Sequence, residues 1–264
     1  MFVNSVDSTA FGVNLNSPKL RYGKKDFFVK IRGYGTNPLW ANKTIETADI
    51  AVSLVRRDTS AENVLKFITA GIRQANQFCL DLYKRSHTGL LRTIRDGWKH
   101  EEGFYGDIVT GYNEGRYSCY KKRLDEAYYN PLARIGIGMT RPNEWHTLVH
   151  ADCDTINDSL DRVFKLSGKI LPKFVHQEIQ KEDMGEVNET IAEIRWIMAH
   201  ATPWTRGSDA ISNVFMRVIY KAIGVKAYPL KPGVSLDLEA YCTELEDYKK
   251  RFCEYFTKPP EIID

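Results

Sequence analysis

The stretch from Thr190 to Ala240 restricts the fold of this chain more than any other part. Before the proline break, apolar residues recur at the spacing of a buried helix face: Ile191, Ile194, Ile197 and Met198. After it, a second set recurs at helical spacing: Ile211, Val214, Phe215, Val218 and Ile219. Proline cannot donate the next helical hydrogen bond and restricts the residue before it, so we expect Pro203 to end the first helix. Gly224 suits a left-handed residue at the end of the second. The stretch therefore predicts helix, tight turn, helix, short loop, helix.

The turn between these two helices carries the residues that could form a binding site. Arg206 and Gly207 stand directly before a predicted helix start, with Ser208 as the expected N-cap and Asp209 in the first turn. Free N–H groups at a helix start, beside a guanidinium, suit a phosphate or pyrophosphate. The alternative is an ordinary capped helix whose arginine pairs with a carboxylate, and capped helices are far commoner than phosphate sites.

A set of short motifs in this stretch resembles the avirulence protein B (AvrB) family of bacterial type III effectors. The motifs are I-A-x-x-x-W, A-x-A-x-P-x-x-R-G-S-x-A, A-I-G and D-L-E-A. The matching residues are Ile191, Ala192, Trp196, Ala199, Ala201, Pro203, Arg206, Gly207, Ser208, Ala210, Ala222, Ile223, Gly224, Asp237, Leu238, Glu239 and Ala240. The likeness extends over about seventy residues, to Glu246 and Tyr248 near the C-terminus.

The resemblance implies a Fic/Doc-like (Fido) fold, which is mostly α with a few short strands. Fido proteins bind nucleotide-containing donors and transfer part of the donor to a protein hydroxyl, and the AvrB branch is associated with glycosyl transfer. The expected donor is a nucleotide or nucleotide-sugar, with no metal, and the expected acceptor is a Ser or Thr hydroxyl of a host or target protein. The resemblance also implies synthesis in the bacterial cytoplasm and secretion into a host or target cell.

The resemblance assigns roles to individual residues. Arg206, Gly207 and Ser208 would bind the donor phosphates. Asp237 would orient or deprotonate the acceptor hydroxyl, or contact the acceptor protein, although an acidic residue in a first helical turn is favoured by the helix dipole alone. Thr110 ends a D-x-V-T segment like one that contributes a nucleotide-contacting threonine in the family, and an ordinary turn threonine is the alternative.

The turn departs from the motif of standard Fic enzymes. Their H-P-F-x-[DE]-G-N-G-R places a histidine base beside the proline, whereas this chain reads T-P-W-T-R-G-S-D-A, with His200 three residues before Pro203. Histidine-based adenylylation is therefore disfavoured. His200 remains a candidate base, and the alternative is a helix-terminal histidine bonded to the backbone. A non-catalytic effector that binds a host protein, and Fic-like nucleotidyl transfer, stay open as alternative functions.

Composition sets broader limits on the function. The chain has 264 residues, with 37 Lys and Arg against 34 Asp and Glu, and a balance of +3 does not indicate nucleic acid or an anionic membrane as partner. Five scattered cysteines without a CxxC pair indicate free thiols. No apolar run reaches membrane-spanning length. We expect a flexible N-terminal arm over 1–20 and a single domain over 21–264, in which 115–150 is a cleft-wall insertion.

The remaining pattern gives coarser expectations. The expected elements are a strand at Phe27–Ile31, helices at Glu46–Arg57, Thr59–Arg85 with a Thr59/Glu62 capping box, and His87–Trp98, a β-like run at Arg134–Met139, a helix at Thr155–Gln180 with a kink at Pro172, and a C-terminal helix from Leu236 that continues through LEDYKKRFCEYF. His146 and His150 would share a helical face, and with Asp152 or Asp154 they suggest a metal site. Hydrogen-bonded histidines on a polar loop are the favoured interpretation.

Overall fold

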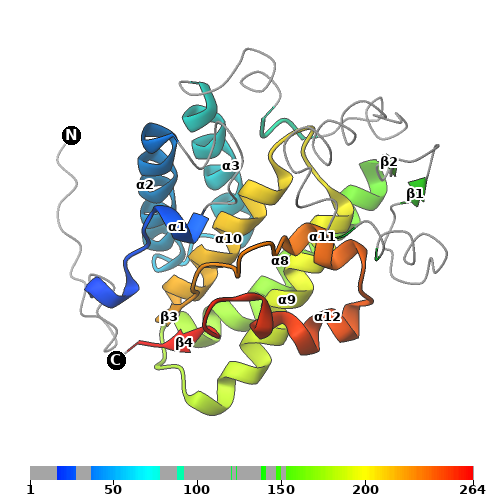
Figure 1. The fold of residues 1–264 in the computed structure, drawn as a ribbon. Helices are drawn as coiled ribbons and strands as arrows, with labels where there is room; N and C mark the ends of the chain where they lie inside the picture. Colours follow the sequence, from blue (N-terminus) through cyan, green and yellow to red (C-terminus); the bar gives the residue numbers. More distant parts are fainter. Residues whose placement is uncertain are drawn as a thin grey trace.

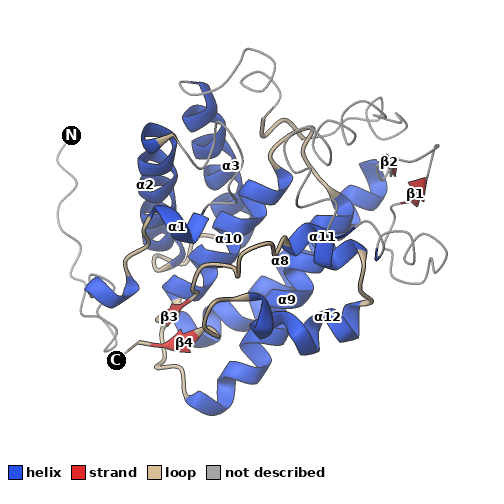
Figure 2. Cartoon of the chain, viewed as in Figure 1, coloured by secondary structure: helices blue, strands red, loops and turns tan. Residues whose placement is uncertain are grey.

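The computed structural model describes residues 17–27, 37–77, 88–91, 120, 123, 138–140, 147–149 and 153–263. Their elements are η1 Pro18–Leu20, α1 Lys24–Phe27, α2 Pro38–Val55, α3 Ala61–Gln77, β1 Gly138–Thr140, β2 Thr147–Val149, α8 Cys153–Val175, η4 Lys181–Asp183, α9 Met184–Ala201, α10 Ser208–Ala222, β3 Val225–Lys226, α11 Leu236–Tyr241, α12 Leu245–Arg251, η5 Phe252–Tyr255 and β4 Glu261–Ile262. Helices dominate the described chain, and this confirms the mostly α fold class (Figure 2).

Helix α10 lies at the centre of the bundle (Figure 1). It contacts α2 and α3 on one side, and α8 and α9 on the other. Every residue of α10 from Ile211 to Ala222 is buried. A helix that is buried all round is normally apolar all round. The polar residues of α10 therefore need a specific explanation, and each is a point at which the core holds a hydrogen-bonding group or a charge.

The predicted helix, turn, helix, loop, helix order of Thr190–Ala240 is confirmed. Helix α9 ends at Ala201, two residues before Pro203 as the proline requires, and Thr202 follows in a left-handed conformation with φ 38°. Gly224 has φ 81°, as expected of a left-handed residue after α10. The apolar faces of both helices belong to one buried core.

The two N-terminal helices begin at different residues from those predicted. Helix α2 starts eight residues before Glu46, because Asn37 caps it and Pro38 occupies its first position. Asn37 Oδ1 accepts from Leu39 N at 3.0 Å. Helix α3 is capped by Ser60 and not by the predicted Thr59. The Ser60 hydroxyl accepts a hydrogen bond from Asn63 N at 3.3 Å.

The other predicted elements agree with the structure in part. Phe27 ends α1, so the predicted strand at Phe27–Ile31 is wrong at its first residue, and 28–31 are not among the described residues. The C-terminal helix is broken: α11 stops at Tyr241 and α12 starts at Leu245. Helix α8 keeps Pro172 inside it, as predicted. Of the expected N-terminal arm, Pro18–Leu20 form η1 and Leu20 is buried.

Two small antiparallel sheets accompany the helices. Strand β1 pairs with β2, with Met139 opposite Leu148, and β3 pairs with β4. Since β2 occupies Thr147–Val149, the stretch between His146 and His150 is not helical, and the predicted shared helical face is wrong. Both histidines lie outside the described residues.

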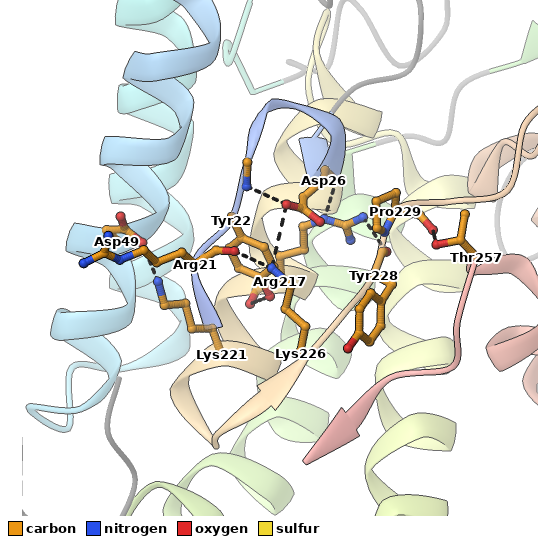
Figure 3. A network of polar contacts seen from close by, with 11 residues as sticks. Arg21, Tyr22, Asp26, Asp49, Arg217, Lys221, Lys226, Tyr228, Pro229 and Thr257 are labelled. Atoms are coloured by element: carbon orange, nitrogen blue, oxygen red, sulfur yellow. Dashed lines mark hydrogen bonds and ion pairs between the residues drawn. The ribbon is translucent and has the colours of Figure 1, made fainter. Parts of the chain in front are cut away.

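The segment 17–27 is held against α10 and β3 by a network of polar contacts (Figure 3). Arg217, fully buried, donates from Nε to the Asp26 carbonyl and from Nη2 to the Tyr228 carbonyl at 3.1 Å. Tyr22 donates its hydroxyl to the Arg217 carbonyl at 2.9 Å. Burial raises the pKa of Tyr22, so the phenol stays protonated and remains a donor. Lys226 Nζ lies 4.4 Å from the centre of the Tyr22 ring.

Candidate functional site

The turn between α9 and α10 is fixed at both ends by left-handed residues. Thr202 at its start has φ 38°, and Gly207 at its end has φ 86°. A left-handed threonine is uncommon and carries a conformational cost, whereas glycine adopts this region readily. A Cβ added to Gly207 would lie 3.0 Å from Thr88 Cγ2, so this position is also tight. The backbone therefore holds Arg206 in one arrangement.

A second segment, residues 88–91, pairs with the turn along its backbone. Thr205 N donates to Leu90 O at 2.9 Å, and Gly89 N donates to Arg206 O at 3.1 Å. These residues do not form the helix predicted over His87–Trp98. Gly89, with φ 70°, takes a conformation that a helix excludes, and the pairing satisfies backbone groups that the helix would have satisfied.

A chain of buried hydrogen bonds connects this pairing to the N-terminal helices. Trp40 Nε1 donates to Asn76 Oδ1 at 2.5 Å, and Asn76 Nδ2 donates to Thr88 Oγ1 at 2.8 Å. Thr88 in turn forms the backbone bridge to Arg206. The side chains on α2 and α3 therefore position the turn, although no local sequence pattern links positions 40, 76, 88 and 206.

Ser208 does not cap α10 as predicted. The N-cap is Gly207, which has no side chain, and within the described chain no side chain caps this helix start. The Ser208 hydroxyl instead closes the turn on itself: it donates to Trp204 O at 3.1 Å and accepts from Trp204 N at 3.3 Å. The first amides of α10 thus keep the anion-attracting character of an uncapped helix start.

Two arginines flank this helix start. Arg206 is half-buried, and its Nε is shielded from solvent. Arg195, from α9, is 1% exposed and donates from Nη2 to Asp209 Oδ1 at 3.0 Å. Arg206 was predicted from the sequence. Arg195 was not, because within a run of apolar residues an arginine gives no sign that it points inward.

His200 lies inside the last turn of α9. It is 1% exposed, its Nδ1 is 2.8 Å from the Trp196 carbonyl, and its ring centre is 3.9 Å from that of Trp196. The edge of Tyr241 approaches it, with ring centres 5.6 Å apart. This is the geometry of a helix-terminal histidine bonded to its own backbone, packed among aromatic rings.

Asp237 lies in the first turn of α11, which packs on α9. It is half-buried, and its Oδ1 accepts the hydroxyl hydrogen of Ser235, the N-cap of this helix. Thr110, the other residue expected to line the site, lies outside the described residues. The structure thus brings Arg206, Gly207 and Ser208 together on one turn, with His200 just before it and Asp237 on a neighbouring helix.

Near Asp237, a buried carboxylate has a full set of partners. Glu239 accepts from Tyr120 at 2.6 Å and from Arg123 through two bonds of 3.0 and 2.8 Å. Burial alone would raise the pKa of Glu239, but the hydrogen bonds from Arg123 and Tyr120 outweigh it and hold this pKa below its ordinary value. Glu239 thus attaches Tyr120 and Arg123 to α11, and its role in the described structure is structural.

Metal ligands, cysteines and membrane spans complete the description of the described part of the chain. It contains no group of three or more His, Cys, Asp or Glu residues that could hold a metal ion. Cys153, Cys242 and Cys253 form no disulfide with one another. None of the helices in the described ranges is long and apolar enough to span a membrane.

The fold and this turn define a mostly helical protein with an uncapped helix start between two arginines. The family model of the AvrB/AvrC avirulence proteins matches residues 120–259, more than half of the chain. The protein therefore belongs to the AvrB/AvrC avirulence protein family, and so to the bacterial avirulence effectors. No curated protein matches the chain. The match includes α9, the turn, α10 and α11, and so every expected site residue except Thr110.

Proposed function

We propose that this protein is a group-transfer enzyme with a Fido-like arrangement of helices, in a single domain over 21–264. Its donor is a nucleotide-containing molecule, most simply a nucleotide-sugar, and its acceptor is a Ser or Thr hydroxyl of a host protein. The observation that carries the proposal is the start of α10, where a rigid turn presents uncapped amides beside the half-buried Arg206.

In the proposed reaction, Arg206 and the amides at Gly207 and Ser208 hold the donor diphosphate. The bond between the sugar and the diphosphate breaks, and the nucleoside diphosphate leaves with the electron pair. The acceptor oxygen bonds to the same sugar carbon and loses its proton to a base. The fixed guanidinium and amides stabilise the charge that develops on the leaving diphosphate. Asp237 is the proposed base or orienting group.

One observation favours a second function, a non-catalytic effector that binds a host protein. Asp237 is already engaged by Ser235, and an acidic residue at this position suits the start of α11 without any catalytic role. In that case the turn would hold a regulatory nucleotide or no ligand.

Ligand-induced thermal stabilisation tests the proposal directly. The full chain is melted with ADP, ATP, UDP-sugars and dTDP-sugars, and bound ligand raises the melting temperature by an amount set by RT ln(1 + [L]/Kd). Arg206→Ala should abolish the shift while the unliganded melting curve stays cooperative. If no donor shifts the curve and a host protein is still captured, the binding function replaces the transferase.

Mass spectrometry then identifies the reaction. A host lysate incubated with donor and the wild-type protein should contain Ser or Thr residues carrying the transferred mass. Asp237→Asn should lose this product while it still shows the donor-dependent thermal shift. An Asp237→Asn variant that transfers at the wild-type rate would remove Asp237 from the mechanism.

A further inference from the structure

Buried polar atoms without hydrogen-bond partners gather around the first two turns of α10. In the described chain they include Arg195 Nε and Nη1, Ser212 Oγ and Asn213 Oδ1. Ser212 is 1% exposed and Asn213 is 6% exposed. Native proteins leave few buried polar groups unpaired, and such groups indicate a bound water, ion or ligand, or a functional role.

Two contacts show which parts of α9 and α10 face each other. Near the start of α10, Arg195 Nη2 is 3.0 Å from Asp209 Oδ1. Near its end, Tyr220 donates its hydroxyl to Asn188 Oδ1 at 2.7 Å. The helices therefore run antiparallel, and Arg195 lies opposite the first turns of α10.

Helical spacing places the unpaired groups of α10 on that same side. Ser212 and Asn213 follow Asp209 by three and four positions, so they flank it on the helix surface. The guanidinium that reaches Asp209 is thus beside the Ser212 hydroxyl and the Asn213 amide. Four unpaired polar atoms, two on α9 and two on α10, thus lie on the facing sides of the two helices below the turn.

The hydrogen-bonding capacity of the Arg195 guanidinium is only partly used. The Arg195 guanidinium has five N–H donors on three nitrogens, and one of these nitrogens, Nη2, donates to Asp209. The Asp209 side chain is 29% exposed. A buried guanidinium needs more hydrogen bonds than this to offset the loss of its hydration. The uncapped start of α10 adds partial positive charge at the same end of the helix. Both features favour an anion.

We propose that Arg195, Ser212 and Asn213 form an inner anion subsite that continues inward from the Arg206 turn and accepts one phosphate group. Arg195 Nε and Nη1 donate to phosphate oxygens, the Ser212 hydroxyl donates to another, and Asn213 turns its NH2 group toward the ligand. Asp209 lies on the solvent-facing side of the subsite, and the phosphate enters from that side. That the phosphate belongs to a nucleotide-type donor rests on the proposed function, whereas the subsite itself does not.

Isothermal titration calorimetry of the full chain with inorganic pyrophosphate and with ADP tests the subsite. Asp209→Asn removes a negative charge beside the anion and should tighten pyrophosphate binding several-fold. Asn213→Asp adds a negative charge among the donors and should weaken it roughly ten-fold or more. Glu189→Gln is the matched control, because it makes the same charge change as Asp209→Asn at an exposed position of α9 and should leave affinity unchanged.

Circular dichroism and cooperative melting establish that each variant is folded. If pyrophosphate gives no binding heat, the cluster holds only buried water and the subsite is rejected. If pyrophosphate binds and responds to Arg206→Ala but not to Asp209→Asn or Asn213→Asp, the subsite is also rejected while the outer turn stands. If pyrophosphate responds to the inner variants but no nucleotide-sugar binds or is consumed, the subsite stands and the transferase proposal fails.

Discussion

Arg195 and Arg217 are both buried arginines on neighbouring central helices, yet their surroundings differ. Arg217 donates to two main-chain carbonyls, from Asp26 and Tyr228, and its own carbonyl accepts from Tyr22. Arg195 makes one hydrogen bond, to the side chain of Asp209, and its Nε and Nη1 have no hydrogen-bond partner among the described residues. Arg217 thus joins three chain segments, whereas Arg195 keeps hydrogen-bonding capacity that the described fold does not use.

This difference separates a structural charge from a candidate binding charge. Main-chain carbonyls cannot be replaced by a ligand without unfolding the segments that carry them. A single carboxylate at a half-exposed position can turn to solvent when an anion arrives. The same residue type, at similar burial, therefore has a different expected role because of the kind of partner it has.

Replacing each arginine by methionine should give the largest contrast. Arg217→Met leaves the Asp26 and Tyr228 carbonyls without their donor and should lower the free energy of unfolding by about 3–5 kcal/mol. Arg195→Met should cost about 1 kcal/mol or less, because Asp209 can be solvated. Urea denaturation measures both. Equal losses from the two variants would mean that Arg195 is as structural as Arg217.

Glu239 is a second buried charge held by several hydrogen bonds, and it should behave like Arg217. Glu239→Gln should destabilise the protein by roughly 2–4 kcal/mol at neutral pH, because Arg123 loses its bidentate partner. The folded-state pKa of Glu239 is depressed, so its contribution is fully present above the unfolded pKa and is lost as pH falls through the folded value. Wild-type stability should therefore drop in acid more steeply than that of the variant, which pH-dependent urea unfolding would show.

Asn76→Ala tests the buried chain that positions the turn. The change leaves the Trp40 indole N–H and the Thr88 hydroxyl without Asn76 and should cost about 2 kcal/mol. It should also weaken pyrophosphate binding, since Thr88 bridges to Arg206. Asn63→Ala makes the same change at an exposed position of α3 and is the matched control. Unchanged affinity in a folded Asn76→Ala protein would show that the turn holds its shape without this chain.

Gly207→Ala should lower stability less than the changes at Arg217, Glu239 and Asn76. A residue with a Cβ is strained at φ 86°, and the added carbon would press on Thr88, so we expect a loss of about 1–2 kcal/mol. The effect on anion binding should exceed the effect on stability, because the amides of the helix start shift. Gly233→Ala, also at positive φ but with open space around it, is the matched control in calorimetry and thermal melting.

Local patterns predicted the central helices and much less of the site. The periodicity of Ile211–Ile219, the break at Pro203 and the glycine at 224 are local signals, and each predicted its element correctly. The pairing of 88–91 with the turn was missed because LLRTI has helical spacing and its backbone partner lies more than a hundred residues away. The Glu239–Arg123 pair and the Arg195 cluster depend on packing between helices, which no spacing within one helix reveals.

The contact between α2 and α3 is close enough to exclude any side chain at Gly71, where a Cβ would overlap with Thr47. Asn76 is five residues further along the same helix, and it bonds Thr88. A bulkier residue at position 71 would push the hairpin apart and tilt that asparagine away from its partner. Loss-of-function screens should therefore recover substitutions at this distant glycine, which would resemble active-site defects although they touch no ligand.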